Sequence, residues 1–224
     1  MINKLLTIIS FLMIGYGTTN AQKVKLTNDF EFKNGLYLSF ESFKNNTPDL
    51  TWEEVKYDAF SNQEKRSIQF KYLNRVDTNN KLKSIPLDTI WGFCAEGVPY
   101  IRVDIPSRAT SEFTVLRTRG RICYFTYEAY IMKEVPMIIY DPNTGRPIFK
   151  KSIQNEELVT VEKIMSFETG EVETFSLPIF KEWIIKTDEK LMTTLEDFNE
   201  TQASEKLYKS MLIFNDRNPV YVSN

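Results

Sequence analysis

Carboxylates are the residues of this 224-residue chain whose types and spacing could most readily perform chemistry. Histidine is absent, which removes the most common general base and the most common metal ligand. Neither a Ser-His-Asp nor a Cys-His catalytic group can therefore form within the chain. Glu53-Glu54, Glu156-Glu157 and Glu171/Glu173 stand close in sequence, and a glycosidase needs two carboxylates that face each other across a sugar. Adjacent residues do not normally face each other, so solvated surface charge is the simpler interpretation.

A second segment with candidate chemistry is Asp141-Pro142-Asn143-Thr144-Gly145, whose oxygen-bearing residues resemble the start of a calcium loop. It lacks the third acidic position and the distal glutamate that would bind calcium through both oxygens, so a hairpin turn is the better interpretation. The sequence contains no phosphate-binding glycine motif and no G-x-S-x-G nucleophile motif. It therefore predicts no metal site, no cofactor and no catalytic residue.

Cys94 and Cys123 are the two cysteines, and they lie in the strand-like runs IWGFCA and RICYFTY. If these runs are neighbours in one sheet, a disulfide would close a loop of about 30 residues and add on the order of 3 kcal/mol of stability. An exported protein can keep such a bond, and we predict that Cys94 and Cys123 are bonded. The alternative is two buried free thiols that pack as small apolar residues.

The first 21 residues predict a cleavable secretory signal peptide. Lys4 gives the positive start, residues 5–15 (LLTIISFLMIG) give an uncharged apolar stretch, and Thr19-Asn20-Ala21 gives the small-residue exit. Cleavage is expected between Ala21 and Gln22. An uncleaved anchor is the alternative, but the apolar stretch is shorter than the ~20 residues of a membrane-spanning helix. No cysteine near the cut could carry a lipid, and no later segment is apolar for long enough to cross a bilayer.

The composition is that of a folded globular protein, with 42% hydrophobic and 26% charged residues. About 200 residues after cleavage correspond to one domain with at most a small appendage. The chain has 28 basic and 30 acidic residues, so removal of Lys4 leaves 27 against 30, a net charge of −3. No basic stripe or polybasic patch is visible, so neither nucleic acid nor a charged membrane surface is an expected partner.

The elements that must position these residues are mostly strands up to about residue 175. Residues 35–43 (GLYLSFESF) and 68–76 (IQFKYLNRV) show the alternation of half-buried strands, and residues 51–58 fit either a strand or a short helix. Ile85 to Ile105 predicts two strands joined at Ala95-Glu96-Gly97.

Further strands are expected downstream of that pair. Residues 113–119 and 121–132 flank Gly120, which marks a turn or a bulge. A hairpin is predicted around the turn at Asp141–Gly145. Its two strands are expected at residues 136–140 and 147–152. One or two more strands are expected between residues 157 and 175, with a turn at Thr169-Gly170.

The periodicity becomes helical after Ser176. Pro178 suits the first turn of a helix capped by Ser176 or Leu177, and Asp188 suits the N-cap of a second. After a break at residues 201–203, a third apolar stripe runs from Leu207 and ends at residues 215–219. The pattern predicts an α+β fold. Residues 22–175 are expected to form an antiparallel β-rich domain, whose sheet or meander begins at about residue 35. Residues 176–224 are expected to form two to three helices. These helices pack on the sheet or form a small bundle.

Four segments of the chain have a recognisable sequence. They are Asn20-Ala21-Gln22, residues 35–48 (GLYLSFESFKNNTP), residues 88–101 with DTIWGF and GVPYI, and residues 214–219 (FNDRNP). Together they resemble uncharacterised exported proteins of the Bacteroidetes type, which carry a domain of unknown function. The resemblance implies a bacterial, exported, β-rich protein, and it brings no activity and no catalytic residue.

Function is predicted mainly from what the sequence lacks. Without histidine or a nucleophile motif, the leading hypothesis is an exported, non-enzymatic binding or envelope-associated protein, periplasmic or secreted, with an unknown protein or glycan as partner. The alternative is a glycan hydrolase that uses two carboxylates. A third possibility is a partner-dependent subunit, which would expose an apolar patch larger than a monomer normally shows.

Overall fold

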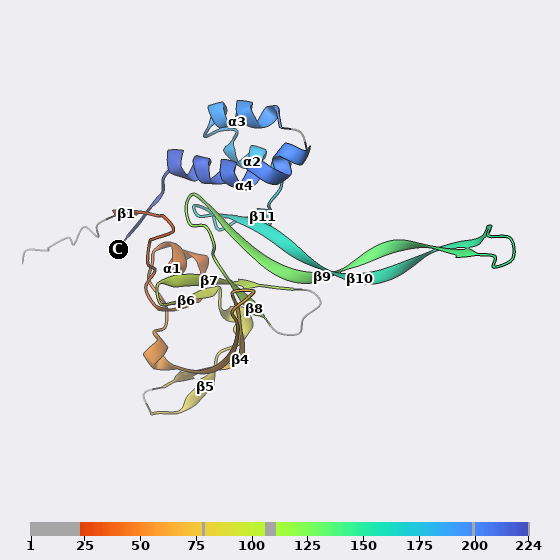
Figure 1. The fold of residues 1–224 in the computed structure, drawn as a ribbon. Coiled ribbons are helices and arrows are strands. Elements are labelled where there is room, and N and C mark those ends of the chain that lie inside the picture. Colours follow the sequence, from red (N-terminus) through yellow and green to blue (C-terminus); the bar gives the residue numbers. More distant parts are fainter. Residues whose placement is uncertain (1–22, 78, 106–110, 199, 224) are drawn as a thin grey trace, which may run out of the picture.

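The computed structural model describes residues 23–77, 79–105, 111–198 and 200–223 (Figure 1). Antiparallel β-sheet is the main regular structure of this chain, as predicted, and a smaller part is helical. The predicted cut between Ala21 and Gln22 lies outside the described residues. The first described element, β1 (Lys23–Lys25), starts at the residue that follows Gln22.

A seven-stranded antiparallel sheet forms the body of the molecule. Its strands, in spatial order, are β2 (Gly35–Tyr37), β6 (Gly92–Ala95), β7 (Val98–Val103), β8 (Glu112–Val115), β4 (Ser67–Val76) and β3 (Val55–Asn62), with β5 (Leu82–Ser84) paired to β4. The predicted β6–β7 hairpin is confirmed. Its two turn residues, Glu96 and Gly97, both have positive φ (51° and 75°), as a tight two-residue hairpin turn requires.

Two predicted segments of the body fold differently. Residues 35–43 were expected to form one strand, but β2 ends at Tyr37 and Ser39 starts the helix α1 (Phe40–Lys44). The Ser39 hydroxyl accepts the Ser42 N–H at 3.1 Å, and this local bond favours a helix start over an extended chain. Residues 51–58 contain both expected alternatives, because the short 3-10 helix η1 (Trp52–Glu54) leads directly into β3. A second 3-10 helix, η2 (Leu87–Thr89), replaces the start of the strand expected from Ile85.

A second sheet contains the long hairpin of β9 (Ile122–Tyr140) and β10 (Pro147–Ser166), with β11 (Val172–Thr174) on the outer edge of β10. The predicted turns at residues 141–145 and 169–170 are confirmed. The two strands expected at 121–132 and 136–140 are in fact one, in which Pro136 pairs with Ser152. A proline is compatible with β9 because β9 is an edge strand, where a missing N–H can face solvent.

The C-terminal region is helical only in part. Three helices are present there, α2 (Leu177–Ile184), α3 (Glu189–Glu196) and α4 (Glu200–Arg217). Ser176 and Asp188 are the N-caps, as predicted, and the Asp188 carboxylate accepts the Leu191 N–H at 2.9 Å. The expected break at 201–203 is wrong because α4 begins at Glu200. The last strand, β12 (Tyr221–Ser223), pairs with β1, so the chain ends in a sheet rather than in the helical segment.

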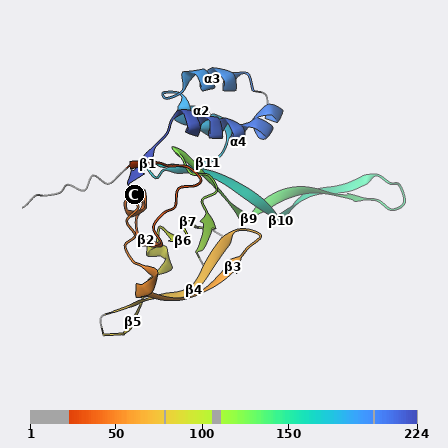
Figure 2. The same cartoon turned by 60° about the vertical axis from the view of Figure 1, so that its left-hand side comes forward.

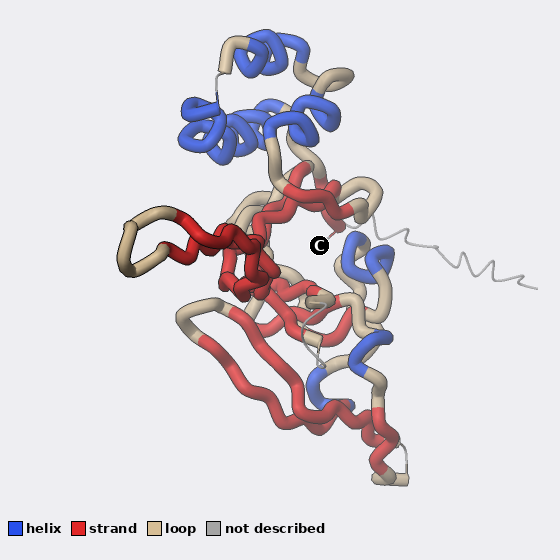
Figure 3. The backbone as a smooth tube through the Cα atoms, turned by 90° about the vertical axis from the view of Figure 1, so that its right-hand side faces the viewer, coloured by secondary structure: helices blue, strands red, loops and turns tan. Residues whose placement is uncertain are grey.

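The base of the β9–β10 hairpin lies between two hydrophobic cores. Cys123, Phe125 and Ala129 on one face pack into the core shared with α1 and β7, whereas Tyr124 on the other face packs against the C-terminal helices. The three helices therefore lie on one side of the hairpin base and the body on the other (Figures 1 and 3). The Asn215 side chain fixes α4 to this base, because it accepts the Ile122 N–H at 2.9 Å and donates to the Ile122 carbonyl at 2.8 Å.

Candidate functional site

The outer part of the β9–β10 hairpin, residues 130–158, is called the arm here, and it projects away from the rest of the molecule (Figures 1 and 2). Every residue of its strands whose side chain is described is exposed. Eleven paired residues of β9 at about 3.3 Å each give the arm a length of roughly 35 Å. No other described element packs on it, so its surface is available to a partner.

The arm concentrates apolar surface. Of the 22 large exposed hydrophobic residues in the described chain, 11 belong to the arm, with exposed fractions from 36% to 65%. They are Tyr130, Ile131, Met132, Val135, Met137, Ile138, Ile139, Tyr140, Ile148, Ile153 and Leu158. A surface strand normally alternates apolar and polar residues, so an apolar sequence on both faces indicates a segment that is covered in use.

One face of the arm continues the core. Ile131, Val135, Met137, Ile139 and Ile153 lie on the face of the hairpin that also carries Phe125, Tyr127 and Ala129, and this set of five is called the inner face here. Alternation along the strand places them together. The opposite face is interrupted at the base of the arm, where Glu128 pairs with Lys65 of the body at 2.5 Å. Lys133, Lys151, Asn155 and Glu157 share the inner face with these five residues, so each face of the arm mixes apolar and charged side chains.

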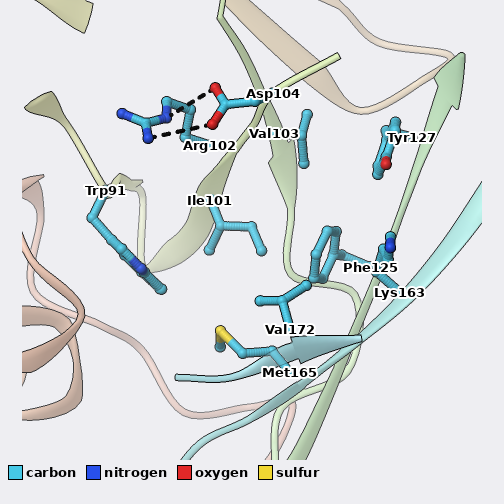
Figure 4. A pocket seen from close by; sticks show the side chains of 10 residues that line it. All are labelled: Trp91, Ile101, Arg102, Val103, Asp104, Phe125, Tyr127, Lys163, Met165 and Val172. Carbon is cyan, nitrogen blue, oxygen red and sulfur yellow. Dashed lines mark hydrogen bonds and ion pairs between the residues drawn. The ribbon is translucent and has the colours of Figure 1, made fainter. Parts of the chain in front are cut away.

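A cavity of about 260 Å³ opens beside the base of the arm, between β7 and the second sheet (Figure 4). Its wall is mostly apolar: Trp91, Ile101, Val103, Phe125, Met165 and Val172, with Arg102, Asp104, Tyr127 and Lys163 as polar members. Arg102 contacts Asp104 at 3.2 Å and also donates to the carbonyl groups of Asp88 and Ile90. The cavity thus offers an apolar surface with one carboxylate, which is already paired.

None of the three carboxylate pairs considered above lines this cavity, although Glu171 lines a separate cavity of about 210 Å³ together with Glu168. Glu54 accepts the Thr51 N–H at 2.8 Å, and this backbone bond lowers the pKa of Glu54. Glu157 lies on the arm and pairs with Lys133 at 2.8 Å. Both of these glutamates therefore have local structural contacts.

A second cavity, of about 250 Å³, contains three carboxylates that sequence reasoning missed: Glu64, Glu112 and Glu128. They come from distant parts of the chain, and no local motif marks them. The Gln69 side chain donates to Glu112 at 3.2 Å, and Lys65 pairs with Glu128. These contacts connect the body to the hairpin base. In the residues that the structure describes, no three His, Cys, Asp or Glu side chains gather as a metal site would require.

The predicted disulfide between Cys94 and Cys123 is not present, and both residues are buried free thiols. Cys94 belongs to β6 of the body, whereas Cys123 belongs to β9 of the second sheet, so they are not neighbours in one sheet. Each thiol donates to a backbone carbonyl, Cys94 to Phe32 at 3.3 Å and Cys123 to Gly120 at 3.4 Å. Burial raises the pKa of both thiols to about 12, so they remain protonated and unreactive at neutral pH.

The Asp141–Gly145 segment is the turn at the end of the arm. The Asp141 carboxylate accepts the Asn143 N–H at 2.8 Å, and the Gly145 N–H donates to the Asp141 carbonyl at 2.8 Å. The bond from Asn143 lowers the pKa of Asp141. The turn interpretation is therefore confirmed, and the Asp141 side chain serves the backbone.

Comparison with known proteins gives no assignment: no protein-family model matches the chain, and no curated protein or solved structure is significantly similar to it. No helix in the described ranges is long and apolar enough to span a bilayer. Function is therefore inferred from the arm and the cavity. The sequence signal for the arm was the apolar run of residues 130–140, whose lack of alternation could have predicted a strand that a partner covers.

Proposed function

We propose that this chain is an exported, non-enzymatic interaction protein that binds its partner through the arm. The arm's 11 exposed hydrophobic side chains are the observation that carries the proposal. Together they present on the order of 800 Å² of surface, divided between the two faces of the ribbon. A partner that covers both faces would bury about the ~800 Å² that each partner contributes to an interface of standard size.

The energetics favour a covered arm. A two-stranded ribbon has no core of its own and is only marginally stable in water. Covering ~800 Å² of apolar surface at about 25 cal/mol per Å² corresponds to roughly 20 kcal/mol before the costs of association. If the free energy gained by covering the arm exceeds the costs of association by even a small amount, the partner binds specifically. The arm is therefore better explained as a binding element than as a free projection.

The glycan hydrolase alternative rests on the cavity that holds Glu64, Glu112 and Glu128. Two of these carboxylates already contact Lys65 and Gln69, which favours a structural role at the hairpin base. Incubation of the purified protein with cell-wall and capsular glycans distinguishes the two functions. Release of reducing ends that is lost in Glu112→Gln, with the fold unchanged, would support the hydrolase and contradict the proposal.

Export is tested by the mass of the protein recovered from its native cells. We expect a chain that begins at Gln22, found outside the inner membrane, because the proposed cut between Ala21 and Gln22 leaves β1 complete. β1 pairs with β12, so a cut after Lys25 would instead remove one strand of that sheet. Intact-mass spectrometry of the fractionated cells gives the answer. Recovery of a chain that keeps residues 1–21 would contradict export by cleavage.

The role of the arm is tested by shortening it. Tyr130 and Leu158 are cross-strand partners, so residues 131–157 can be replaced by Asn-Gly as a two-residue hairpin turn. The shortened protein should keep the melting temperature of the body to within about 4 °C, because no described element packs on the removed part. It should lose binding to envelope vesicles of the native cells, and self-association, when both are measured by sedimentation.

The outcome against the proposal is equally clear. If the shortened protein binds vesicles and self-associates as strongly as the mature protein, the arm is not the binding element. The melting temperature serves as the control, because a large decrease would mean that the arm supports the body rather than a partner.

A further inference from the structure

We infer that two copies of this chain join through the outer edge of β10, so that their arms form one four-stranded antiparallel ribbon. The exposed hydrophobic residues of the arm lie mainly on β9, which carries eight of the 11. Pairing through β10 leaves β9 at the outside of the ribbon, where it stays free to bind the partner proposed above. The inference therefore goes beyond the proposed function and rests on a separate observation.

The outer edge of β10 is unpaired over most of the length of the arm. β11 pairs only with residues 163–165, and the Phe175 N–H donates to the Glu162 carbonyl at 3.0 Å. No described strand pairs with this edge at residues 148–160, which are called the open edge here. The backbone groups of its even-numbered residues face outward, because the Glu162 carbonyl and the Ser166 N–H bond on that side and directions alternate along a strand. An unpaired edge of this kind is a template for another strand.

The other edge of the arm, on β9, cannot pair in the same way. Pro136 lies opposite Ser152, whose backbone groups face the open edge, so the backbone nitrogen of Pro136 faces outward from β9. Proline has no N–H to donate, and it is confined to edges that do not pair. The open edge contains no proline. Pairing through β10 therefore gives a closed dimer, because Pro136 interrupts the edge at which further copies would add.

Symmetry and charge select one register for the two strands. Opposite residues point to the same face of a sheet, so the two-fold axis must pass through a residue, and Gln154 is the middle of the open edge. An axis at Gln154 places Lys151 opposite the partner's Glu157, and Glu157 opposite the partner's Lys151. Moving the axis by one residue would place Lys151 opposite Asn155 or Val159 instead. The register centred on Gln154 is therefore the one that pairs these opposite charges.

The charged residues of the arm suit contact along an edge. Lys151 and Glu157 are exposed, and Lys151 has no ion pair within the described ranges. Glu157 contacts Lys133 at 2.8 Å, and its carboxylate has two oxygens, so it can also accept from the partner's Lys151. Pairing edge to edge leaves both faces of the ribbon in solvent, whereas packing face to face would bury these charges at a large cost.

The expected interface has the size of a weak but specific contact. Narrow pairs at every second residue from 150 to 158 give about ten backbone hydrogen bonds, the number found in a typical interface. Pairing also converts a marginally stable two-stranded ribbon into a four-stranded sheet. The contact buries roughly 1,000 Å² in total, at the low end of specific interfaces, so we expect a dimer of micromolar affinity.

A cysteine at the axis tests the arrangement directly. Gln154→Cys places the two introduced thiols opposite each other, and we expect a disulfide-linked dimer under mild oxidation. Glu134→Cys is the matched control, because Glu134 lies directly opposite Gln154 in the same hairpin and is also exposed. The two copies of residue 134 would be three strand spacings apart, about 14 Å, and should crosslink at least about tenfold less. Cys94 and Cys123 are buried and should not contribute.

Lys151→Cys tests the direction and register of the pairing. Residue 151 lies six positions from its own copy, about 20 Å, when the axis is at Gln154. It should therefore crosslink as weakly as Glu134→Cys. Parallel pairing in register would instead place both copies of residue 151 side by side, and a strong Lys151→Cys crosslink would overturn the inferred arrangement. Non-reducing electrophoresis of the three variants gives the comparison.

Sedimentation of proline variants then measures the association without crosslinking. The mature protein should show a monomer–dimer equilibrium with a micromolar midpoint. Gln154→Pro removes an outward N–H at the axis and no bond to β9, and should weaken the dimer at least about tenfold. Glu134→Pro removes an outward N–H at the other edge and should leave the midpoint unchanged. No described element packs on either position, so the body should remain folded in both variants.

Reversal of charge tests the contact between Lys151 and the partner's Glu157. Lys151→Glu places like charges opposite each other and should weaken the dimer about tenfold or more. Adding Glu157→Lys to that variant restores opposite charges across the interface and should recover most of the loss. A double variant as weak as Lys151→Glu alone would contradict the register.

Failure of this inference and failure of the proposed function have different signatures. A mature protein that stays monomeric to about 100 μM, or a Glu134→Cys crosslink as strong as that of Gln154→Cys, would overturn the inferred dimer. If such a protein still loses its binding to envelope vesicles when the arm is shortened, the proposed function stands. If the dimer forms through β10 but the shortened protein binds vesicles as strongly as before, the inferred dimer stands and the proposed function is wrong.

Discussion

Replacement of Gly35 by alanine is expected to remove most of the folding stability of this protein. Gly35 has φ = +142°, which residues with a side chain rarely adopt. A Cβ atom at this position would lie 2.4 Å from the Leu50 carbonyl oxygen and 2.9 Å from Pro48 Cβ. The backbone of β2 would have to move away from residues 48–50, and we expect a loss of roughly 4 kcal/mol or more in the free energy of unfolding.

Gly145→Ala is the matched control for this prediction. Gly145 also has a positive φ of 66°, but it lies at the tip of the arm and no heavy atom would lie within 4 Å of its Cβ. Only the conformational cost remains there, about 1 kcal/mol. Chemical unfolding of both variants followed by circular dichroism measures the difference. Equal stabilities for the two variants would show that the contact with Leu50 is not the cause.

Raising the pH above 9 is expected to destabilise the protein steeply. A thiol in the unfolded chain has its ordinary pKa of 9.0, whereas burial raises the pKa of Cys94 and Cys123 to about 12. Burial also raises the pKa of Tyr37, and burial with the Glu162 hydrogen bond raises that of Tyr124. Between pH 9 and about pH 12 the two thiols have released their protons in the unfolded state but keep them in the folded state. The stability that their burial contributes is therefore complete below pH 9 and decreases as the pH rises.

The expected size of this effect is large. Each thiol contributes about 1.4 kcal/mol per pH unit, so the two together cost roughly 5 kcal/mol at pH 11, comparable with the stability of many domains. Denaturant titrations at intervals from pH 7 to pH 11 measure the change. Cys94→Ala with Cys123→Ala should flatten the profile between pH 9 and pH 10. An unchanged stability up to pH 11 in the unmodified protein would contradict the prediction.

Local structure could be predicted wherever short-range chemistry decides it. Asp188 begins a helix because its carboxylate accepts the Leu191 N–H, and the helix after Ser176 begins where Pro178 fixes the dihedral angle of the first turn. Glu96-Gly97 and Asp141–Gly145 form turns because their residues tolerate the required dihedral angles or bind their own backbone. The same local chemistry explains one error, since the Ser39 cap ended a strand that alternation alone had extended to residue 43.

The disulfide and the candidate site depended on contacts between distant residues. Local preference for a strand places Cys94 and Cys123 in strands, but it cannot say that the strands belong to different sheets. The same limit applies to the cavity, whose wall joins Trp91 and Ile101 to Met165, and to the carboxylates Glu64, Glu112 and Glu128. No short-range signal connects residues so far apart in the chain.

The sequence by itself determined that the fold is β-rich, two of its helix starts, its turns and the mainly apolar composition of residues 130–140. Only the tertiary structure decided that this run is uncovered, because burial depends on what packs against a strand and not on the strand itself. The β9–β10 hairpin has 19 residues in its first strand, of which the base lies between two cores and the remainder extends past both. Residues with the same apolar character thus form a core at Phe125 and an exposed surface at Val135.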